Sequence, residues 1–243
     1  MIKIEDAKVF NIEGAIAGMR FPMQSWAKSD SFITVPEMQT IKFDEFNTLT
    51  GENLTNVSIG PNDLALAQKL IASGADSHSK FLRQIFVSMN ITAPLYFFKE
   101  FDTYKIGTTS NSESTMHTLS KRPITKECFS FDGLYENHID ECSIIQKTLM
   151  DDVEIIINIC EGLRQDYVET GDKVFWRSLI QLLPSSWNQM RHWTANFQVL
   201  RKIYIDRRFH KLQEWKDFCK EIEKLPYGKE LITFGVNNND ATE

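Results

Sequence analysis

The chain has 243 residues, with 27 Lys and Arg against 33 Asp and Glu, so its formal net charge is −6. Its 42% hydrophobic and 25% charged residues exclude a wholly disordered or collagen-like protein. No apolar run approaches the roughly 18 residues of a membrane-spanning helix, and the acidic balance argues against a general nucleic-acid binder, which would carry a basic excess. We therefore expect a globular protein with neither a membrane nor a nucleic-acid polymer as its partner.

The first sixty residues are predicted to be loops with short extended pieces at 9–12 and 32–35, because Pro22, Pro36, Gly51 and many Ser, Thr and Asn residues interrupt them. A loop-rich segment of this length in a compact domain is often functional. Four of its side chains therefore either line a binding site or form a solvated surface: Arg20, Trp26, Lys28 and Ser31.

Clearer elements begin at residue 62. A leucine spacing of four residues predicts a helix over 62–73, with Asn62 as its N-cap. In the segment 85–92 the odd positions are all apolar and the even positions mostly polar, which is the period-2 pattern of a half-buried strand. Pro94 then starts a second helix with an aromatic-rich face.

The second helix is followed by nine residues, 107–115, that include no apolar side chain. Such a hydroxyl-rich stretch is either a linker or a loop that supplies hydrogen-bond donors to an anionic ligand, because hydroxyl and backbone N–H groups are compact and adaptable. Composition alone leaves both interpretations open.

The second half is predicted to be mainly helical. Apolar residues repeat at steps of three or four from 145 to 167, which indicates one long amphipathic helix ending at Gly171. Its expected buried stripe is Ile145, Leu149, Val153, Ile156, Cys160, Leu163 and Tyr167. A helix capped by a serine at 185 or 186 should bury Trp193, Phe197, Leu200 and Tyr204, and a last helix should bury Leu212, Trp215, Cys219 and Ile222.

These elements predict one α/β domain over residues 1–243, with a helical C-terminal half. Within it, residues 1–60 form a loop-rich N-terminal portion, and the polar tail 237–243 is expected to be flexible. We find no internal repeat and no composition shift that marks a domain boundary.

Standard catalytic and metal motifs are absent from the sequence. It has no phosphate-binding glycine loop, dinucleotide fingerprint, serine-nucleophile elbow or zinc-protease motif. The four cysteines include no C-x-x-C pair and form no zinc-spaced cluster with histidine: Cys128, Cys142, Cys160 and Cys219. We therefore expect no metal site and free thiols in a cytoplasmic protein. The N-terminus lacks a long apolar run, which predicts no signal peptide.

A basic cluster at residues 207–211 stands out in an acidic chain. Positive charge near the end of a helix complements the helix dipole. Arginine and lysine that converge on one point instead form an anion site, in which they clamp a phosphate. Both interpretations stay open at this stage.

Two parts of the sequence resemble a known family. Residues 93–106, with an Ala-Pro helix start, and then Asn111-Ser112-Glu113-Ser114 are similar to the central segment of flavin-dependent thymidylate synthases, in which R-H-R-x-x-S-x-N-E-x-S-x-R follows such a start. Leu183-Pro184, Trp193-Thr194-Ala195-Asn196 and 207–213 are similar, in order and spacing, to later segments of that family. The resemblance covers about residues 70–225 and implies a mixed sheet packed with long helices.

The resemblance also implies a function. The substrate would be a pyrimidine nucleotide, dUMP or a related one, with FAD as the hydride-carrying cofactor, a folate as one-carbon donor, and a homotetramer whose sites are built from several subunits. It assigns the nucleotide to Lys105, Asn111, Ser112, Ser114, Thr115 and Arg191. It assigns the flavin, or a second anion, to His78, Gln84, Tyr104, Asn196, Arg207, Arg208 and Lys211.

The sequence also departs from the pattern of that family. Thr103-Tyr104-Lys105 stands where the family has R-H-R. Ser112 replaces the glutamate of the family, and Met116 replaces its last arginine. Gln84 lies at the position of the flavin-contacting histidine, unless His78 substitutes for that residue. Each lost charge-assisted hydrogen bond weakens ligand binding by about 1.5–3 kcal/mol. Three hypotheses follow: an active one-carbon transferase, an inactive protein of the same fold that captures or senses a nucleotide, and a purely structural oligomer.

Overall fold

The structure is a computed structural model that describes residues 2–34, 42–43, 49–50, 56–134 and 149–236. Its Cα atoms group into two compact units that interleave along the chain. The first unit is Met1–Ile4, Asn90–Thr103 and Ser110–His192, and the second is Glu5–Met89, Tyr104–Thr109 and Trp193–Glu243. The single domain expected from the sequence stays a prediction.

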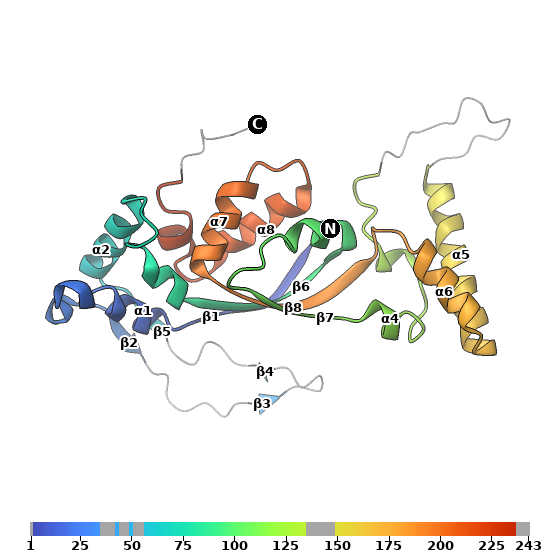
Figure 1. The fold of residues 1–243 in the computed structure, drawn as a ribbon, viewed down its shortest axis with the longest axis horizontal. Helices are drawn as coiled ribbons and strands as arrows, with labels where there is room; N and C mark the ends of the chain where they lie inside the picture. Colours follow the sequence, from blue (N-terminus) through green and yellow to red (C-terminus); the bar gives the residue numbers. More distant parts are fainter. Residues whose placement is uncertain (1, 35–41, 44–48, 51–55, 135–148, 237–243) are drawn as a thin grey trace. The chain divides into compact units, whose positions relative to one another are not determined.

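The main sheet has four strands in the order β1-β6-β8-β7 (Figure 1). They are β1 (Lys3–Phe10), β6 (Phe86–Pro94), β8 (Asn188–Asn196) and β7 (Thr109–Ser112), and each has residues in both units. Two smaller antiparallel pairs join β2 (Phe32–Thr34) to β5 (Asn56–Ser58) and β3 (Lys42–Phe43) to β4 (Leu49–Thr50). Together with the helices, these strands confirm the predicted α/β class.

Strand β6 confirms the period-2 pattern of the sequence. Its buried side chains alternate with half-buried polar ones, and they are Val87, Met89, Ile91 and Ala93. Pro94 ends the strand, and α3 (Leu95–Phe101) follows it directly. The aromatic face predicted for this helix is buried: the ring centroids of Phe97, Phe98 and Phe101 lie 5.3–6.0 Å apart.

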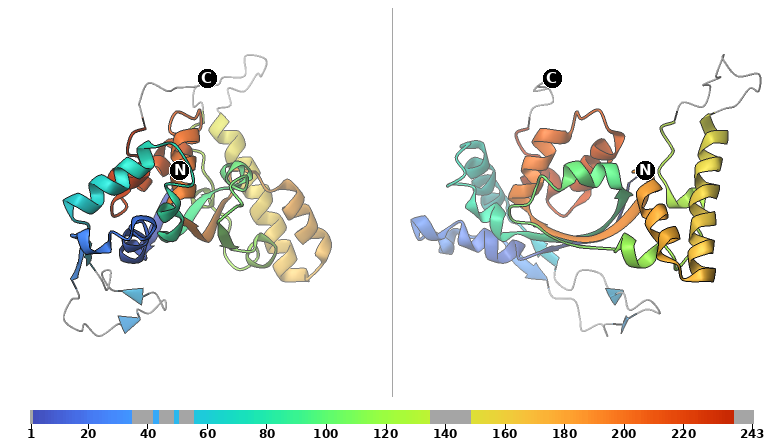
Figure 2. Two further views of the ribbon diagram at one scale, coloured as in Figure 1. Left: turned by 60° about the vertical axis from the view of Figure 1, so that its left-hand side comes forward. Right: turned by 45° about the vertical axis from the view of Figure 1, so that its right-hand side comes forward.

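The first unit also contains a pair of longer helices, α5 (Leu149–Thr170) and α6 (Lys173–Leu182), which lie side by side (Figure 2). Val153 and Cys160 are buried as predicted, but the prediction for Ile156 is wrong, because Ile157 is buried and Ile156 is 41% exposed. Three consecutive isoleucines occupy this turn, and helical spacing alone does not distinguish a step of three from a step of four. Ile145 lies outside the described residues.

The second unit contains α1 (Ile12–Gly18), α2 (Pro61–Ala72), α7 (Phe197–Arg207) and α8 (Gln213–Lys224), with α7 and α8 side by side (Figure 1). On α8 the predicted stripe of Trp215, Cys219 and Ile222 is buried. The indole of Trp215 packs edge-on against Phe218, with ring centroids 6.1 Å apart. These aromatic contacts form the centre of this unit's core.

Two elements differ from the prediction. The stretch 107–115 is neither a linker nor a free loop: it contains β7 and the first residue of the short helix α4 (Thr115–Thr118). β7 is the last strand in the sheet order and all four of its residues are exposed, so it needs no apolar side chains. Trp193 lies on strand β8 rather than on the predicted helix. Residues 187, 189, 193 and 195 are buried, which is the period of two expected where one face of a strand is covered.

Candidate functional site

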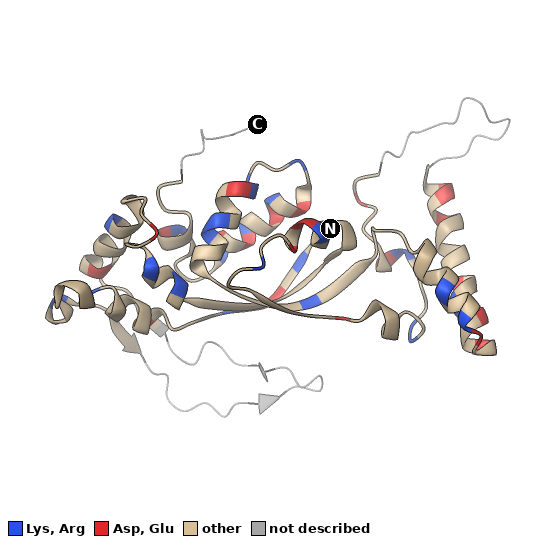
Figure 3. Ribbon diagram, viewed as in Figure 1, with Lys and Arg blue, Asp and Glu red and all other residues tan. Residues whose placement is uncertain are grey.

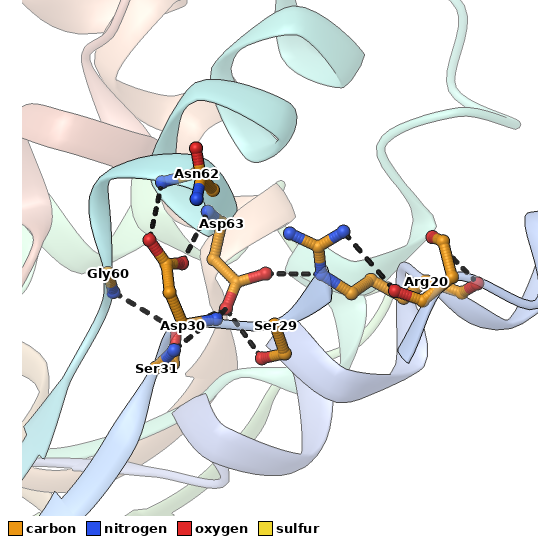
Figure 4. Close-up of polar contacts among 8 residues, drawn as sticks. Arg20, Ser29, Asp30, Ser31, Gly60, Asn62 and Asp63 are labelled. Carbon is orange, nitrogen blue, oxygen red and sulfur yellow. Dashed lines mark hydrogen bonds and ion pairs between the residues drawn. The ribbon is translucent and has the colours of Figure 1, made fainter. Parts of the chain in front are cut away.

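Two of the four N-terminal side chains that the sequence singled out belong to a buried polar network in the second unit (Figure 4). The Arg20 guanidinium donates through Nε to Asp63 Oδ1, and the two side chains are 5% and 0% exposed. The other oxygen of Asp63 accepts from the hydroxyl of Ser29 at 2.7 Å and from the backbone N–H of Ser31 at 3.1 Å. The network therefore ties the N-terminal segment to α2.

The same network corrects the predicted helix cap. α2 begins at Pro61 with Gly60 as its N-cap, and Asn62 is not the cap. The carboxylate of Asp30 instead accepts from the backbone N–H groups of Asn62 at 2.9 Å and Asp63 at 3.0 Å (Figure 4). A carboxylate from a distant segment thus satisfies the orphan donors of this helix.

Every contact of Asp63 in the network is internal to the protein. Burial raises the pKa of Asp63, but hydrogen bonds from Ser31, Ser29 and Arg20 outweigh burial and leave the pKa below its ordinary value. Arg20 and Ser31 therefore contribute to this internal network, whereas Trp26, at 53% exposed, and Lys28 lie on the surface.

Arg191, predicted to hold the phosphate, lies in the first unit on strand β8. Its guanidinium carbon lies 3.9 Å from the ring centroid of Phe98. Its Nη1 donates to Asp102 Oδ1 at 2.7 Å, and its Nε donates to the side-chain oxygen of Gln189 at 2.9 Å. The side chain is only 12% exposed, and its third nitrogen, Nη2, has no acceptor among the residues that the structure describes. One direction of the guanidinium thus remains for an anion.

The polar stretch predicted to hold the nucleotide runs beside Arg191 in the same unit. The side-chain N–H₂ of Gln189 donates to the backbone oxygen of Glu113 at 2.8 Å and to the hydroxyl of Thr115 at 3.4 Å. Ser114 is the N-cap residue of α4, and its side chain makes no capping hydrogen bond. Ser114 and Thr115 are half-buried, while Asn111 and Ser112 are exposed. Gln189 therefore connects this stretch to Arg191.

The second unit gathers most of the residues predicted to bind the flavin. Tyr104 packs edge-on against Trp215, with ring centroids 5.9 Å apart, and Arg207 lies over the same indole at 4.9 Å. The Tyr104 hydroxyl accepts from Arg207 Nε at 2.9 Å and donates to Asp206 at 3.3 Å. Burial raises the pKa of Tyr104 above its ordinary value.

More positive charge lies near this ring pair. Arg207 ends α7, and Arg208 and Lys211 follow in the connection to α8 (Figure 3). Lys105 and Lys211 are both exposed, and Lys105 directly follows Tyr104 in the chain.

Lys105 belongs to the second unit, together with Tyr104. The other residues predicted to bind the nucleotide belong to the first unit.

The remaining predicted flavin ligands make contacts within the second unit. His78 Nδ1 lies 3.0 Å from the Ser73 hydroxyl. The backbone oxygen of Gln84 accepts from the side chain of Asn11 at 2.9 Å. Asn196 caps α7 by accepting from the Val199 N–H at 3.0 Å, and its side chain lies beside Gly107, where an added Cβ would approach Nδ2 to 3.1 Å. Gly107, at φ 76°, thus lets the chain pass close to the start of α7.

The first unit contains a cavity that no sequence pattern predicts. The cavity has a volume of about 340 Å³, and its polar lining includes Thr92, Glu113, Arg122, Glu127 and Asn188. A larger one of about 620 Å³ shares Glu127 and Asn188 with it, so the two adjoin. The lining residues come from β6, β8 and the segment 113–128, and no spacing rule relates such positions in a sequence.

No group of three or more His, Cys, Asp or Glu side chains in the described part of the chain is arranged to hold a metal ion. In the same part, no helix has the length and apolar character needed to cross a membrane. The described cysteines Cys128, Cys160 and Cys219 are free thiols, whereas Cys142 lies outside the described residues.

Comparison with known proteins identifies the fold. No protein-family model matches the chain, and a search of curated proteins finds no match. Thymidylate synthase X of Helicobacter pylori, in a crystal structure with FAD and dUMP, is similar with a TM-score of 0.61 and 16% identity over 96% of each chain. The UMP/dUMP methylase PolB of Streptomyces cacaoi, bound to 5-Br UMP, is similar with a TM-score of 0.54 and 11% identity over 97% of this chain and 94% of PolB. The resemblance that the sequence predicted is thus confirmed at the level of the fold.

Proposed function

We propose that the protein binds a pyrimidine nucleoside monophosphate and transfers a one-carbon unit to it, with reduced flavin as the hydride source. The observation that carries this proposal is the match of fold over 96% of both chains to a thymidylate synthase whose crystal structure contains FAD and dUMP. A fold by itself does not determine a function, so the proposal also depends on the side chains.

Residues of the first unit support the nucleotide part of the proposal. Arg191 supplies a fixed guanidinium that is held against Phe98 by Asp102. Ser114 and Thr115 supply hydroxyl groups at the N-terminal end of α4, connected to Arg191 through Gln189. In the proposed complex Arg191 Nη2 and these hydroxyls bind the phosphate, while Asn111 and Ser112 on β7 bind the sugar or base.

Residues of the second unit fit the chemistry of a flavin. Arg207, Arg208, Lys211 and Lys105 offer cations for the diphosphate of FAD. Half-buried Tyr104 offers an aromatic ring beside Arg207, and the buried Trp215 packs against that ring edge-on. When bound, reduced flavin would supply the hydride and a folate would supply the one-carbon unit. The protein's own contribution would be to bind and orient these ligands.

A second candidate is a protein of the same fold that binds the nucleotide without turning it over. Two observations favour it. Asp102 already neutralises Arg191, and Thr103 and Tyr104 stand where an arginine and a histidine are expected, so that only Lys105 keeps a positive charge at this point of the chain. Such a protein would bind nucleotide with reduced affinity and carry no flavin.

The test begins with the purified full-length protein. A flavin absorbance spectrum, or a rise in melting temperature on adding FAD, supports the enzyme, because a ligand that binds only the folded state must stabilise it. Release of tritium from C5-labelled dUMP or UMP, in the presence of methylenetetrahydrofolate and reduced flavin, then measures one-carbon transfer. A colourless protein that is stabilised by dUMP or UMP but not by FAD supports the second candidate. No response to any nucleotide overturns both.

The proposed enzyme would assemble as a homotetramer, with sites built from several subunits. Its exposed polar β7 and its separate clusters of cations support sites that a second subunit completes. The molecular mass in solution tests this: a mass near four times 28.2 kDa is expected, and a strict monomer overturns the shared site.

A further inference from the structure

The N-terminal segment 20–33 of the second unit turns polar side chains inward and apolar side chains outward. Arg20, Ser29 and Asp30 contact α2 within the Asp63 network, as Figure 4 shows. Five large apolar side chains of the same segment, here called the N-terminal apolar face, are exposed: Phe21 (64%), Met23 (83%), Trp26 (53%), Phe32 (61%) and Ile33 (48%). Folding of an isolated subunit favours the opposite arrangement, because apolar side chains gain free energy when they leave water.

The backbone under this face is ordered by its own hydrogen bonds. Phe21–Met23 and Trp26–Lys28 are 3-10 turns, each closed by a backbone hydrogen bond of 3.0 Å. The two turns bring the rings of Phe21 and Trp26 together, with their centroids 5.6 Å apart. A partner would therefore meet a surface that is already arranged, which lowers the entropy cost of binding.

The exposed apolar area is comparable with one side of a protein interface. A large side chain carries about 150–250 Å² of surface, so the five side chains together expose on the order of 600 Å². The largest apolar patch of a typical monomer measures about 300–600 Å². A standard interface buries about 800 Å² on each partner, so this face provides most of one side.

The residue types also match the core of an interface. Trp, Phe and Met are enriched there and charged residues are depleted, and Trp is prominent among the residues that dominate binding energy. Between residues 21 and 33 the charged side chains are Lys28 and Asp30. Asp30 accepts hydrogen bonds from the start of α2, so Lys28 is the one exposed charge of this segment.

The charge of the chain indicates which partner fits this face. With a net charge of −6 on each, two copies of the chain repel each other over most of their surfaces. A twofold contact places the same face on both sides, where like charges would oppose it. A large apolar face with one charge avoids most of that repulsion. We propose that the N-terminal apolar face is an interface between two copies of this chain.

This inference deepens the homotetramer of the proposed function, and it rests on the proposed function for the presence of more than one copy. It adds the surface at which two copies meet and identifies Phe21 and Trp26 as the paired rings that each copy contributes. Nucleotide binding does not enter the argument, so the interface and the nucleotide site can be tested separately.

Sedimentation velocity of the full-length protein tests the proposal. We expect a wild-type mass above the 28.2 kDa of one chain, and the double variant Phe21→Ser, Trp26→Ser should halve that mass by weakening the contact at least tenfold. Both side chains are exposed, so the variant should keep the fold, which circular dichroism checks. The double variant Val168→Ser, Val174→Ser is the matched control, because it removes side chains that are 57% and 56% exposed in the first unit, and it should leave the mass unchanged.

A cross-linking measurement checks the contact without any substitution. In a mixture of unlabelled and isotopically labelled protein, a lysine-reactive cross-linker should join Lys28 of one copy to Lys28 of another. A twofold axis through the face brings these two side chains together. Linked peptides that contain one labelled and one unlabelled half identify a contact between copies rather than within one.

A double variant of wild-type mass overturns the proposal and leaves the homotetramer standing, and so does a multimeric wild type without the mixed Lys28 link. A wild type of 28.2 kDa overturns both. If that monomer binds phosphatidylcholine vesicles and the double variant does not, the face belongs to a lipid surface instead. The melting temperature with UMP measures the proposed function independently: if UMP causes no shift while the double variant has half the wild-type mass, the proposed function fails and the interface stands.

Discussion

Two polar clusters of this protein each combine an arginine with two carboxylates, and they differ in burial and in pairing. The network around Asp63 in the second unit buries its carboxylate completely and its Arg20 to 5% exposure. The cavity in the first unit leaves Arg122 and Glu127 exposed, and no salt bridge joins its guanidinium to a carboxylate in the described residues. One cluster satisfies all its charges internally, and the other presents them to solvent.

Burial and pairing therefore distinguish charged groups that stabilise the fold from charged groups that a ligand can reach. Burying an ionised carboxylate destabilises the folded state unless the carboxylate is paired and hydrogen-bonded. The contacts of Asp63 with Arg20, Ser29 and Ser31 therefore stabilise the fold. The charges of the cavity remain hydrated, so a ligand can replace their water. The predictions below treat the first cluster as structural and the second as dispensable for stability.

The largest effect is expected from Asp63→Asn. The substitution leaves the guanidinium of Arg20 buried without its carboxylate, so the free energy of unfolding should fall by about 3–5 kcal/mol. Urea denaturation measures this. Asp76→Asn is the control, because Asp76 is 76% exposed and its contact with Arg83 is 3.7 Å long; it should change stability by less than about 0.5 kcal/mol. A loss below about 1 kcal/mol in Asp63→Asn would contradict a structural role for the network.

An intermediate case is Glu161, a paired carboxylate in the first unit. Arg164 donates to it through Nη2 at 2.6 Å and Nε at 2.7 Å, and the backbone N–H of Ile124 donates at 2.7 Å. The hydrogen bond from Arg164 is the main reason that the pKa of Glu161 is lowered to about 2. Because the folded-state pKa is depressed, its contribution to stability is fully present above the ordinary carboxylate value of 4.5 and is lost as the pH falls toward 2.

The measurement compares the wild type with Glu161→Gln. At pH 7 the variant should be less stable by about 2 kcal/mol, and the difference should shrink on acidification to pH 3. Chemical denaturation at both pH values shows the change. A difference that stays constant between the two pH values would mean that this carboxylate is not selectively stabilised in the folded state.

Gly60→Ala tests how tightly the Asp63 network is packed. A Cβ at Gly60 would lie 2.2 Å from the carboxyl carbon of Asp30 and 2.4 Å from its backbone oxygen. Asp30 must then move away from the start of α2 and lose its hydrogen bonds there, so stability should fall by about 1–3 kcal/mol. Gly162→Ala on α5 is the control, since its Cβ would meet nothing within 4 Å and alanine favours a helix. Equal melting temperatures for the two variants would contradict the close packing.

Sequence patterns predicted the elements whose burial is periodic. The alternation in β6 and the stripe of Trp215, Cys219 and Ile222 are confirmed because one face of each element is buried, and burial is what the pattern records. β7 was missed because an edge strand with four exposed polar residues leaves no such pattern. The spacing of Trp193, Phe197 and Leu200 predicts one helix, but residues 188–196 form β8, whose burial has a period of two.

The candidate site was less accessible to sequence reasoning. The resemblance to thymidylate synthases selected Arg191 and Tyr104, but not Asp102 and Gln189, which hold Arg191 in place. Arg20 and Ser31 looked like site residues because polar loop positions are ambiguous until their partners are known. Glu113, Arg122 and Asn188 line the same cavity although they are far apart in the sequence. No local sequence motif predicts such a cavity.

The smallest effect on stability is expected at the cavity. Glu127→Gln removes an exposed charge without a salt bridge and should leave the free energy of unfolding unchanged. Arg122→Ala removes a guanidinium that lies 5.8 Å from the ring centroid of Trp187, so it should lower the free energy of unfolding by less than about 1 kcal/mol. Urea denaturation of both variants beside Asp63→Asn measures the contrast directly. A loss of several kcal/mol in either cavity variant would place these charges among the structural ones.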